Sequence, residues 1–501
     1  MKRIVTLSMM CSCALLAQSI DLGEIDVYSD AISKEIKNVN QEELKSADLA
    51  EVLGRNLPNI SIVRRNGIAN DIILRGMKKD NINILIDDAK IHGACPNRMD
   101  PPTSHILNNN IEDVIVSEGP YDVENFGSMG GVVKITTKQP KSGFGGEAGL
   151  NMGSYGYQKF QASTSGGNDK VRLSVGGSLE EADQYEDGDG NTLSQQLDNS
   201  VASGVGTLMN RYQTQYKNMK AYEKKTGMIK LFINPNENQE LRFSYTANRS
   251  DNVLYANSPM DAEYDDSNIY TVGYTIKNLS TFSKELSLEA YSSDVDHPMS
   301  GKYRQGAINT DKYRTNHVES EIKGVKLKNS FDLADGVLML GIDGSERNWD
   351  GQFYDTNNTT GIRSNYSVSI PDVTTKNRAI FTTFEKNIDK LNLKFGARYD
   401  DTTITADKNL TAFNANTIKE NDFKALSANV LATYSVDSEL RYFLGFGKSS
   451  RVPDAKELYV GTQAFGDLEQ TKNYQTDIGF NLDKENFGIN GKAFYSILKD
   501  H

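Results

Sequence analysis

The residues best suited to chemistry lie in the stretch IHGACPNRMDPPTSH, residues 91–105. Cys95 and Met99 are four residues apart, and His92 and His105 flank them. Thiolate, thioether and imidazole are the ligands that soft metal ions prefer, Cu(I) above all. The two prolines that follow Met99 restrict the backbone and favour a shaped loop over a helix. A buried structural cysteine packed against a methionine would explain the same residues, so this stretch alone leaves both interpretations open.

The N-terminus has the pattern of a secretory signal peptide. Lys2 and Arg3 precede an uncharged, mostly apolar run, Ile4–Ala17, and Ala17-Gln18-Ser19 supplies small residues for cleavage. Residues 1–19 are therefore predicted to be removed. No later stretch approaches the roughly 20 consecutive apolar residues that a transmembrane helix needs, so we expect none in the mature protein.

Cleavage would leave one cysteine. The chain has three, and Cys11 and Cys13 belong to the predicted signal peptide. Cys95 then stands alone in an oxidising compartment, where an odd cysteine indicates a free thiol or an intermolecular bond. Because no intramolecular disulfide remains possible, the purely structural interpretation of Cys95 loses weight.

The composition favours a transmembrane β-barrel of a Gram-negative cell envelope. Hydrophobic residues make up only 38% of the chain, while Gly (41), Tyr (24) and Phe (19) are frequent and Trp (1) is rare. Barrels look hydrophilic on average because lipid-facing and lumen-facing residues alternate. The net charge of −12 argues against nucleic acid as a partner and is compatible with a surface that attracts cations.

From about residue 143 the sequence alternates as amphipathic strands do, and we predict about fifteen of them. Their ranges are 147–154, 159–165, 171–179, 226–233, 240–248, 269–276, 285–293, 318–330, 337–347, 377–385, 391–399, 425–436, 439–448, 474–482 and 487–496. The predicted connections alternate between short turns and long polar loops, among them 180–225, 249–268, 294–317, 348–376, 400–424 and 449–473. Short periplasmic turns and long extracellular loops are typical of outer-membrane barrels.

A compact α/β block precedes the strands. Glu42–Leu53 has helical apolar spacing, and short apolar runs follow at 60–63, 72–74, 82–86 and 114–116 before a glycine-rich turn and strand at 127–138. This block resembles the plug domain of TonB-dependent outer-membrane receptors. The matching pieces, in the family's order and spacing, are Leu57-Pro58-Asn59-Ile60, Ile73-Leu74-Arg75-Gly76, Ile84–Asp88, Ile111-Glu112-Asp113-Val114, Glu118-Gly119-Pro120 and Gly127–Lys138. Ser450–Tyr459 also resembles a motif of receptor barrels.

The resemblance implies a plug inside an antiparallel barrel in the outer membrane, surrounded by lipid. The expected domains are a signal peptide (1–19), a TonB box and linker (20–39), a plug (40–140) and a barrel (141–501). Residues 20–30 read as a loose extended peptide, a kind of segment that can add to a partner's sheet edge. The resemblance makes Glu24, Ile25, Asp26, Val27, Tyr28 and Ser29 a TonB box, which TonB and its inner-membrane energising complex would pull. The short linker leaves no room for a signalling domain, which favours a transporter over a sensor.

Barrels of this family have roughly 22 strands. The resemblance therefore implies about seven strands beyond those predicted here, and we expect the 501 residues to be a fragment or a truncated product that lacks the terminal aromatic residue. An open sheet leaves unpaired edges in lipid, so we expect this chain alone not to insert as a stable barrel.

Strand parity places a second pair of metal-binding residues near the first. The seventh strand should run outward and deliver DVDHPMSGKYR to the extracellular side, with His297 and Met299 two residues apart in a loop shaped by Pro298. Together with Cys95 and Met99, this H-x-M resembles the TonB-dependent copper receptors, which pair a plug C-x-x-x-M with a barrel-loop H-x-M. That resemblance implies that Cys95, Met99, His297 and Met299 are the copper ligands. Three sulfurs and one nitrogen favour Cu(I) over Zn(II), which seldom takes a thioether.

Other residues receive secondary roles. His92 and His105 are expected to orient the ligands rather than touch the metal. Met209, Met219 and Met260, in the predicted outer loops, are a candidate copper relay or ordinary loop residues. No nucleophile–base arrangement or phosphate-binding loop appears, so we predict no enzyme activity. The sequence thus favours a TonB-dependent copper importer; the alternatives are a receptor for an iron chelate (siderophore) and, from another class, a passive pore or surface adhesin.

Overall fold

The computed structural model describes residues 27–30, 32–37, 48–106, 110–255, 258–406, 420–460, 463–464 and 468–501. The predicted signal peptide and Glu24–Asp26 of the predicted TonB box lie outside these residues. Among the residues described, no helix is both long enough and apolar enough to cross a membrane.

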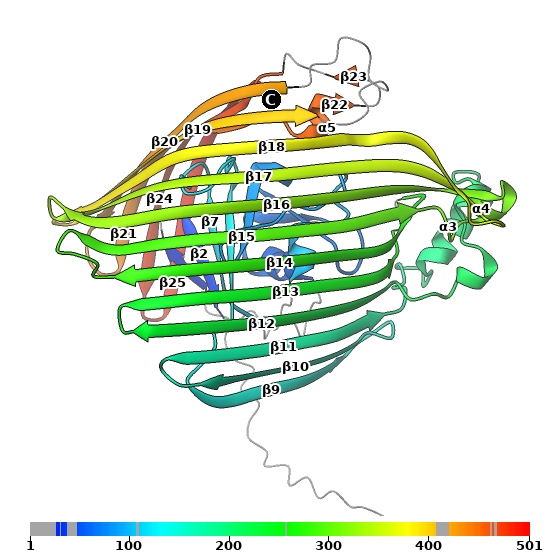
Figure 1. The fold of residues 1–501 in the computed structure, drawn as a ribbon, viewed down its shortest axis with the longest axis horizontal. Helices are drawn as coiled ribbons and strands as arrows, with labels where there is room; N and C mark the ends of the chain where they lie inside the picture. Colours follow the sequence, from blue (N-terminus) through cyan, green and yellow to red (C-terminus); the bar gives the residue numbers. More distant parts are fainter. Residues whose placement is uncertain are drawn as a thin grey trace, which may run out of the picture.

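Fifteen antiparallel strands form one curved sheet that wraps around an N-terminal domain (Figure 1). Each strand pairs with its neighbour in the chain, and β9 and β25 form the two edges of this sheet. The strands are β9 (Gly143–Met152), β10 (Gln158–Gly167), β11 (Val171–Ala182), β12 (Tyr222–Asn236), β13 (Gln239–Val253), β14 (Asp261–Lys277), β15 (Ser283–Ser300), β16 (Lys312–Leu333), β17 (Gly336–Asn357), β18 (Arg363–Ile388), β19 (Leu391–Ala406), β20 (Glu420–Ser435), β21 (Leu440–Arg451), β24 (Thr471–Lys484) and β25 (Phe487–Lys499). The predicted fold class is confirmed.

Many strands extend well beyond their predicted ends. The predicted loops 294–317 and 348–376 shrink to the connections 301–311 and 358–362, because β15 to β18 continue through the polar residues on either side. The apolar alternation used for prediction covers only the part of a strand that faces lipid. The polar ends still pair their backbones, and this pairing leaves no pattern in the sequence.

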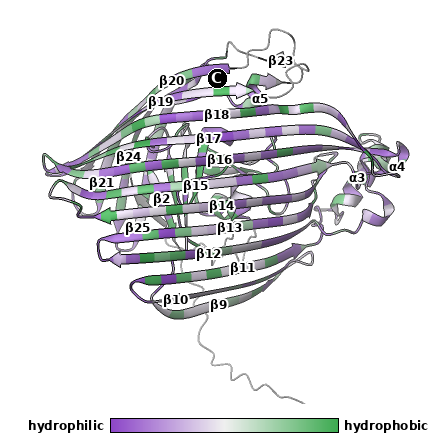
Figure 2. Cartoon of the chain, viewed as in Figure 1, coloured by the Kyte–Doolittle hydropathy of each residue, from purple (hydrophilic) through white to green (hydrophobic). Residues whose placement is uncertain are grey.

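The wall has an inner and an outer face. Along β12, Tyr222, Lys224, Thr226, Met228 and Lys230 are buried toward the plug, while the alternate residues are more exposed. Large apolar side chains are exposed on most strands, among them Leu173, Ile229, Val272, Leu288, Val325, Leu340, Ile380, Phe395, Leu444 and Ile478. Figure 2 shows hydrophobic and hydrophilic residues interspersed along the strands. This exposed apolar face is the surface expected to meet lipid.

The plug is built on a six-stranded sheet in the order β1-β2-β7-β8-β5-β6. These strands are β1 (Val27–Asp30), β2 (Ser33–Lys37), β5 (Ile82–Ile86), β6 (Ala89–Lys90), β7 (Ile111–Glu118) and β8 (Gly131–Thr137); β3 (Ile60–Val63) and β4 (Asp71–Leu74) form a separate hairpin. Helix α2 (Leu49–Asn56) begins after the N-cap Asp48 and ends three residues beyond the predicted limit at Leu53. Residues 42–47 of the predicted helix lie outside the described residues.

The shorter elements lie mainly between barrel strands. Helices α3 (Leu193–Ala202) and α4 (Gln305–Asn309) lie at one end of the barrel, on the right in Figure 1, and the turns at the opposite end are short. The remaining elements are α5 (Ala455–Leu458), the strand pair β22 (Tyr459–Val460) and β23 (Gln463–Ala464), and the 3-10 turns η1 (Lys79–Asn81), η2 (Pro102–His105), η4 (Leu208–Asn210) and η5 (Thr214–Tyr216).

The described part of the predicted TonB box is not a loose peptide. Val27–Ser29 belong to β1, which pairs antiparallel with β2 at the edge of the plug sheet. The expectation of a free extended segment is therefore wrong for these residues, because their backbone groups already have partners within the plug. Their role as a TonB box stays a prediction.

Plug and wall share one hydrophobic core. Ile269, Val295 and Val318 of the barrel pack into the same cluster of buried residues as the plug strands and α2. Buried polar contacts add to this packing: Arg75 of the plug pairs with Asp477 of β24 at 2.5 Å and with Glu118 at 3.0 Å. The plug is thus held in a fixed orientation, which determines what its loops meet on the wall.

Candidate metal centre

The loop between β6 and η2 brings Cys95 and Met99 together through a tight turn. The backbone N–H of Arg98 donates to the carbonyl oxygen of Cys95 at 2.8 Å, and Arg98 has a φ of +57°. Pro96 occupies the second position of this turn, where its fixed φ is favourable. The turn reverses the chain after Cys95, so that Met99 returns to the same side.

Asp100 and Gly93 give this loop its shape. The Asp100 carboxylate accepts hydrogen bonds from the backbone N–H groups of Ala94 and Cys95, the latter at 3.0 Å. A Cβ on residue 93 would lie only 2.3 Å from the carbonyl oxygen of Asp100, so only glycine fits there. Burial raises the pKa of Asp100 above its ordinary value. The loop is therefore specified from within the plug.

Side chains of the barrel wall also donate hydrogen bonds to this loop and to η2, which follows it. The Tyr255 hydroxyl donates to the Met99 carbonyl, the Trp349 indole N–H donates to the Ala94 carbonyl at 2.8 Å, and the Lys224 ammonium donates to the Ser104 carbonyl at 2.7 Å. These donors come from different strands or connections of the wall. The position of Cys95 therefore depends on the wall as well as on the plug.

His297 and Met299 lie in a strand, and the prediction of a loop here is wrong. Both belong to β15, where His297 pairs with Val318 and Met299 with Asn316 of β16. On the other side, three residues of β14 between Ala262 and Asp266 oppose two residues of β15, a β-bulge beside Pro298. Proline, which lacks an N–H, is tolerated in a sheet at such a bulge. The strand therefore continues through Pro298.

All four predicted ligands converge. Cys95, Met99 and Met299 pack in one cluster of buried side chains and are 4%, 7% and 5% exposed. His297 is fully buried, and the Cys95 thiol is close enough to interact with its imidazole. The His297 Nε2 atom is buried and makes no hydrogen bond with any described residue. Two plug and two barrel side chains thus lie in one buried region, and the His297 Nε2 there has no hydrogen-bond partner among the described residues.

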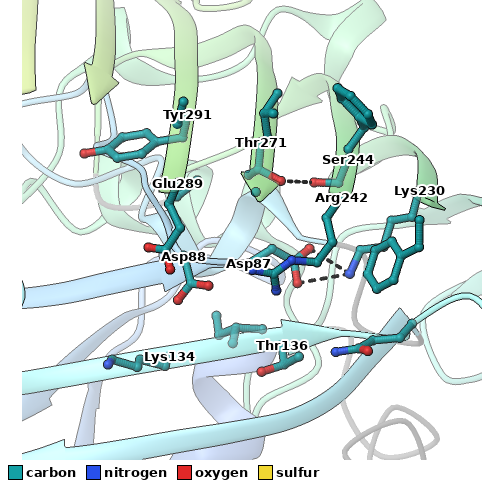
Figure 3. A pocket seen from close by; sticks show the side chains of 18 of the residues that line it. Asp87, Asp88, Lys134, Thr136, Lys230, Arg242, Ser244, Thr271, Glu289 and Tyr291 are labelled. Carbon is teal, nitrogen blue, oxygen red and sulfur yellow. Dashed lines mark hydrogen bonds and ion pairs between the residues drawn. The ribbon is translucent and has the colours of Figure 1, made fainter. Parts of the chain in front are cut away.

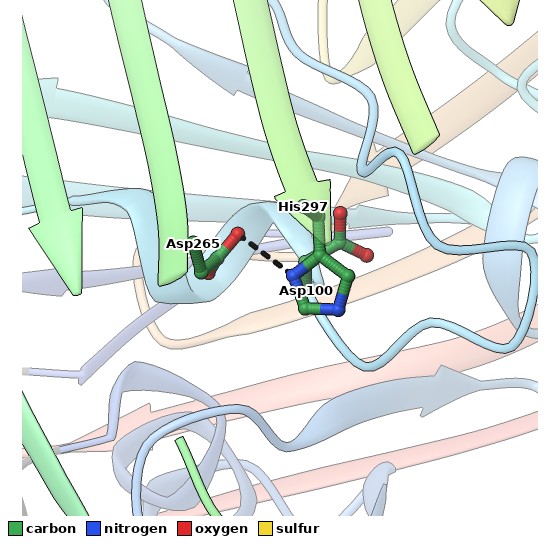
Figure 4. Close-up of side chains that lie close together, drawn as sticks. All are labelled: Asp100, Asp265 and His297. Carbon is green, nitrogen blue, oxygen red and sulfur yellow. Dashed lines mark hydrogen bonds and ion pairs between the residues drawn. The ribbon is translucent and has the colours of Figure 1, made fainter. Parts of the chain in front are cut away.

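The carboxylate of Asp265 contacts the other ring nitrogen of His297, Nδ1. Its Oδ1 lies 3.2 Å from His297 Nδ1, and Figure 4 shows the two side chains reaching toward each other from neighbouring strands. His105 of the plug lies against the same carboxylate, with Nδ1 3.9 Å from Oδ2 of Asp265. Asp100, Asp265 and His297 present ligand atoms within 4.8 Å of one another. Asp265 therefore connects His297 to the plug, and the outer role of His105 stays a prediction.

His92 contacts Asp80 and not Asp265. Its Nδ1 lies 3.1 Å from Oδ1 of Asp80, which also accepts a hydrogen bond from Arg98 at 2.7 Å. Burial lowers the pKa of His92 to about 3, so the imidazole is neutral. For Asp80, burial opposes ionisation, yet Arg98, His92 and Arg347 together hold its pKa well below the ordinary value. His92 thus supports the loop through Asp80.

The three methionines considered as a copper relay lie in different surroundings. Met260 is partly buried and packs against the Cys95 cluster. Met219 packs in another cluster around Tyr212 and Tyr303, and the Met209 sulfur lies at the surface, 3.5 Å from the Asn309 amide nitrogen. Only Met260 adjoins the four predicted ligands, and a relay role stays a prediction.

A cavity of about 140 Å³ lies nearer the short-turn end of the same strands. It is bounded by the β5–β6 turn of the plug and by β12 to β15, and Figure 3 shows Lys230 of the wall reaching Asp87 of the plug. Their closest contact is 3.0 Å, and Lys230 also donates to the Thr137 carbonyl. Strands β14 and β15 thus line both the four-residue cluster and this cavity.

Sequence reasoning missed the residues that position the ligands: Asp100, Asp265, Tyr255 and Trp349. The role of Asp100 could have been predicted, because an aspartate next to Met99 is able to accept hydrogen bonds from the backbone N–H groups of the loop. Asp265 carries no such signal. It belongs to a run of acidic residues, and only the bulge in β14 selects it rather than Asp266 to face His297.

A wall of alternating strands that wraps around a plug and shares a hydrophobic core with it is typical of a plugged outer-membrane receptor. Comparison with known families identifies it: residues 139–500 match the family described as TonB dependent receptor-like, beta-barrel, and residues 30–132 match the TonB-dependent Receptor Plug Domain. The chain belongs to the TonB-dependent receptors, which are outer-membrane proteins of Gram-negative bacteria that work with TonB and are transporters rather than a class of enzymes.

Similar solved structures come from more than one kind of transporter. The copper transporter OprC has a TM-score of 0.81 at 20% identity, covering 95% of this chain and 72% of that chain. The FrpB iron transporter from Neisseria meningitidis (F3-3 variant) has a TM-score of 0.72 at 17% identity, covering 95% and 74%. The ferric yersiniabactin uptake receptor FyuA from Yersinia pestis has a TM-score of 0.69 at 13% identity, covering 94% and 73%. A search of the curated proteins finds no significant match. At such identities the likeness shows the fold alone.

Proposed function

We propose that this receptor binds copper as Cu(I) and imports it into the periplasm. The observation that carries the proposal is the buried Nε2 of His297, which lacks a hydrogen-bond partner among the described residues. The His297 side chain interacts with Cys95, which packs in one cluster with Met99 and Met299. A buried polar atom without a partner is costly. A soft metal ion satisfies it and uses the three sulfurs at once.

The neighbouring carboxylates favour a soft ion over a hard one. The oxygens of Asp100 accept the N–H groups of Ala94 and Cys95, and those of Asp265 face His297 and His105. These oxygens are engaged in holding the site together. The donors that remain are one cysteine sulfur, two thioethers and an imidazole. Zn(II) seldom takes a thioether, and Fe(III) prefers harder donors.

The ligands come equally from plug and wall, which suggests how the ion is released. Cys95 and Met99 are carried by the plug, while His297 and Met299 are carried by β15. Force applied by TonB to the N-terminal segment moves the plug and not the wall, so it separates the two halves of the site. Binding by this receptor is therefore coupled to plug position, and no chemical step is needed.

The first test is the metal preference of the purified chain in detergent. We expect one Cu(I) per chain, measured by anaerobic competition with a chromogenic Cu(I) chelator, and no displacement by a tenfold excess of Zn(II) or Fe(III). Tighter binding of Zn(II) or Fe(III) than of copper would rule the proposal out. Cells should take up copper only when TonB is present.

The similarity to iron transporters keeps a siderophore receptor as the second candidate. Such a receptor recognises a bulky chelate and has no need of Cys95. Binding of ferric chelates by the same preparation, with an affinity unchanged by Cys95→Ser, would favour it over the copper proposal.

Replacing Asp265 by asparagine should weaken Cu(I) binding about 10- to 100-fold, the usual cost of losing an outer partner of a metal-bound histidine. The amide keeps the volume but no longer holds the negative charge opposite His297 Nδ1. Asp266→Asn is the matched control, because Asp266 is the next residue of β14 and pairs with Arg249 of β13 at 3.6 Å. Equal affinities of the two variants, from the same chelator competition, would contradict the role given to Asp265.

A further inference from the structure

A second cavity, of about 70 Å³, lies between the plug and the wall beside the metal-binding loop. The plug contributes Lys90 and His92 to it, and the wall contributes Arg347 and Trp349. The end of β21 adds Arg451 to the lining. None of the four predicted copper ligands lines this cavity, so it is a separate site.

Three cations face the cavity with donors to spare. The Lys90 ammonium donates to the Phe126 carbonyl at 2.9 Å and forms no ion pair with a described residue. Arg347 has Asp80 as its nearest carboxylate, at 3.9 Å, and its guanidinium stacks on the Trp349 ring at 4.4 Å. Arg451 is 7% exposed; its terminal nitrogens pair with Glu457, while its Nε is buried without a partner.

One cation at the cavity has no carboxylate partner among the described residues. The lining cations are Lys90, Arg347 and Arg451, and the lining carboxylates are Asp80 and Asp454. Asp80 pairs with Arg98 at 2.7 Å and Arg451 pairs with Glu457, which leaves Lys90 without an ion pair in the described part of the chain. An uncompensated buried charge is costly, and a bound monoanion removes that cost.

The rest of the lining is mixed, with the polar residues Ser345, Thr375 and Asn377 beside several apolar side chains. Trp349, Val373 and Val452 lie beside the cations, together with Phe126 and Ile322. Since one water occupies about 30 Å³ of liquid, the cavity suits a ligand of only a few heavy atoms. A short carboxylate meets both requirements, because its charged end pairs with the cations and its methyl or ethyl end contacts the ring and the aliphatic side chains.

We propose that this cavity binds a small monocarboxylate between Lys90, Arg347 and Arg451, with the Trp349 ring as one wall. The site stands independently of copper binding. It nevertheless adjoins the metal-binding loop, because Trp349 also donates to the Ala94 carbonyl next to Cys95.

Trp349 makes the proposal directly testable, because it is the only tryptophan in the chain. The purified chain in detergent is titrated with sodium acetate and sodium propionate, and sodium gluconate, which is too large for the cavity, keeps the ionic strength constant. We expect a saturable change in tryptophan fluorescence. A linear response to both carboxylates, or saturation by chloride with none by the carboxylates, would overturn the proposal.

Two variants test the residues. Lys90→Met should weaken acetate binding about tenfold or more through loss of a charge-assisted bond. Ala455→Leu should abolish the response by filling the cavity, even if Lys90→Met fails to fold. Lys376→Met is the matched control, because Lys376 is exposed on β18 and pairs with Glu346 outside the cavity. An unchanged acetate affinity in Ala455→Leu, or in a folded Lys90→Met, would contradict the assignment.

Discussion

Replacing Cys95 by serine should weaken Cu(I) binding by more than about 100-fold, beyond the loss expected for an outer partner. Cys95 supplies the only thiolate in the four-residue cluster, and a thiolate is the strongest of its soft donors. Serine has nearly the same volume and leaves the hydrogen bonds of the loop backbone to Asp100 intact. The expected effect is therefore on affinity and not on folding. Anaerobic chelator competition measures the affinity, and the thermal unfolding midpoint reports on the fold.

Methionine variants provide the comparison for this result. Met299→Leu removes one thioether at nearly constant volume and should weaken Cu(I) binding less than Cys95→Ser does. Met339→Leu is the matched control, because Met339 is a buried barrel methionine outside the cluster. If Cys95→Ser binds Cu(I) as tightly as the Met339→Leu control, the copper proposal fails and the siderophore alternative gains support.

Replacing Gly93 by alanine should abolish high-affinity Cu(I) binding without removing any ligand. The added Cβ would lie 2.3 Å from the Asp100 carbonyl oxygen and 2.8 Å from its carboxylate, so the loop must shift. Asp100 then loses the geometry that orients Cys95. Overpacking of this kind typically costs about 1–3 kcal/mol of stability. Chelator competition and thermal unfolding of the same preparation measure the two effects.

Gly188→Ala is the control for this variant. Gly188 has open space around its Cβ position and no positive φ, so alanine should leave both copper binding and stability unchanged. Wild-type Cu(I) affinity in Gly93→Ala would show that the loop tolerates a shift, and that the packing of Asp100 against Gly93 does not determine the site.

The local patterns of the sequence were sufficient for the fold class. Alternation located all fifteen barrel strands, because a strand between lipid and lumen must change polarity at every residue. It failed at the strand ends in β15 to β18, where neither face meets lipid and the backbone pairing leaves no periodic trace. Strand parity also brought His297 and Met299 to the same end of the barrel as the plug loop.

What the sequence determined by itself was the identity and spacing of the soft donors: a solitary Cys95 with Met99, and a separate His297 with Met299. Only the tertiary structure decided that they meet, because a hydrogen-bonded turn returns Met99 toward Cys95 while the wall register carries β15 past that turn. The tertiary structure also determines which residues hold the ligands in place. A single extra residue in β14 directs Asp265 inward, and a one-residue slip in a strand moves every side chain to the opposite face, so no local pattern predicts which carboxylate holds His297.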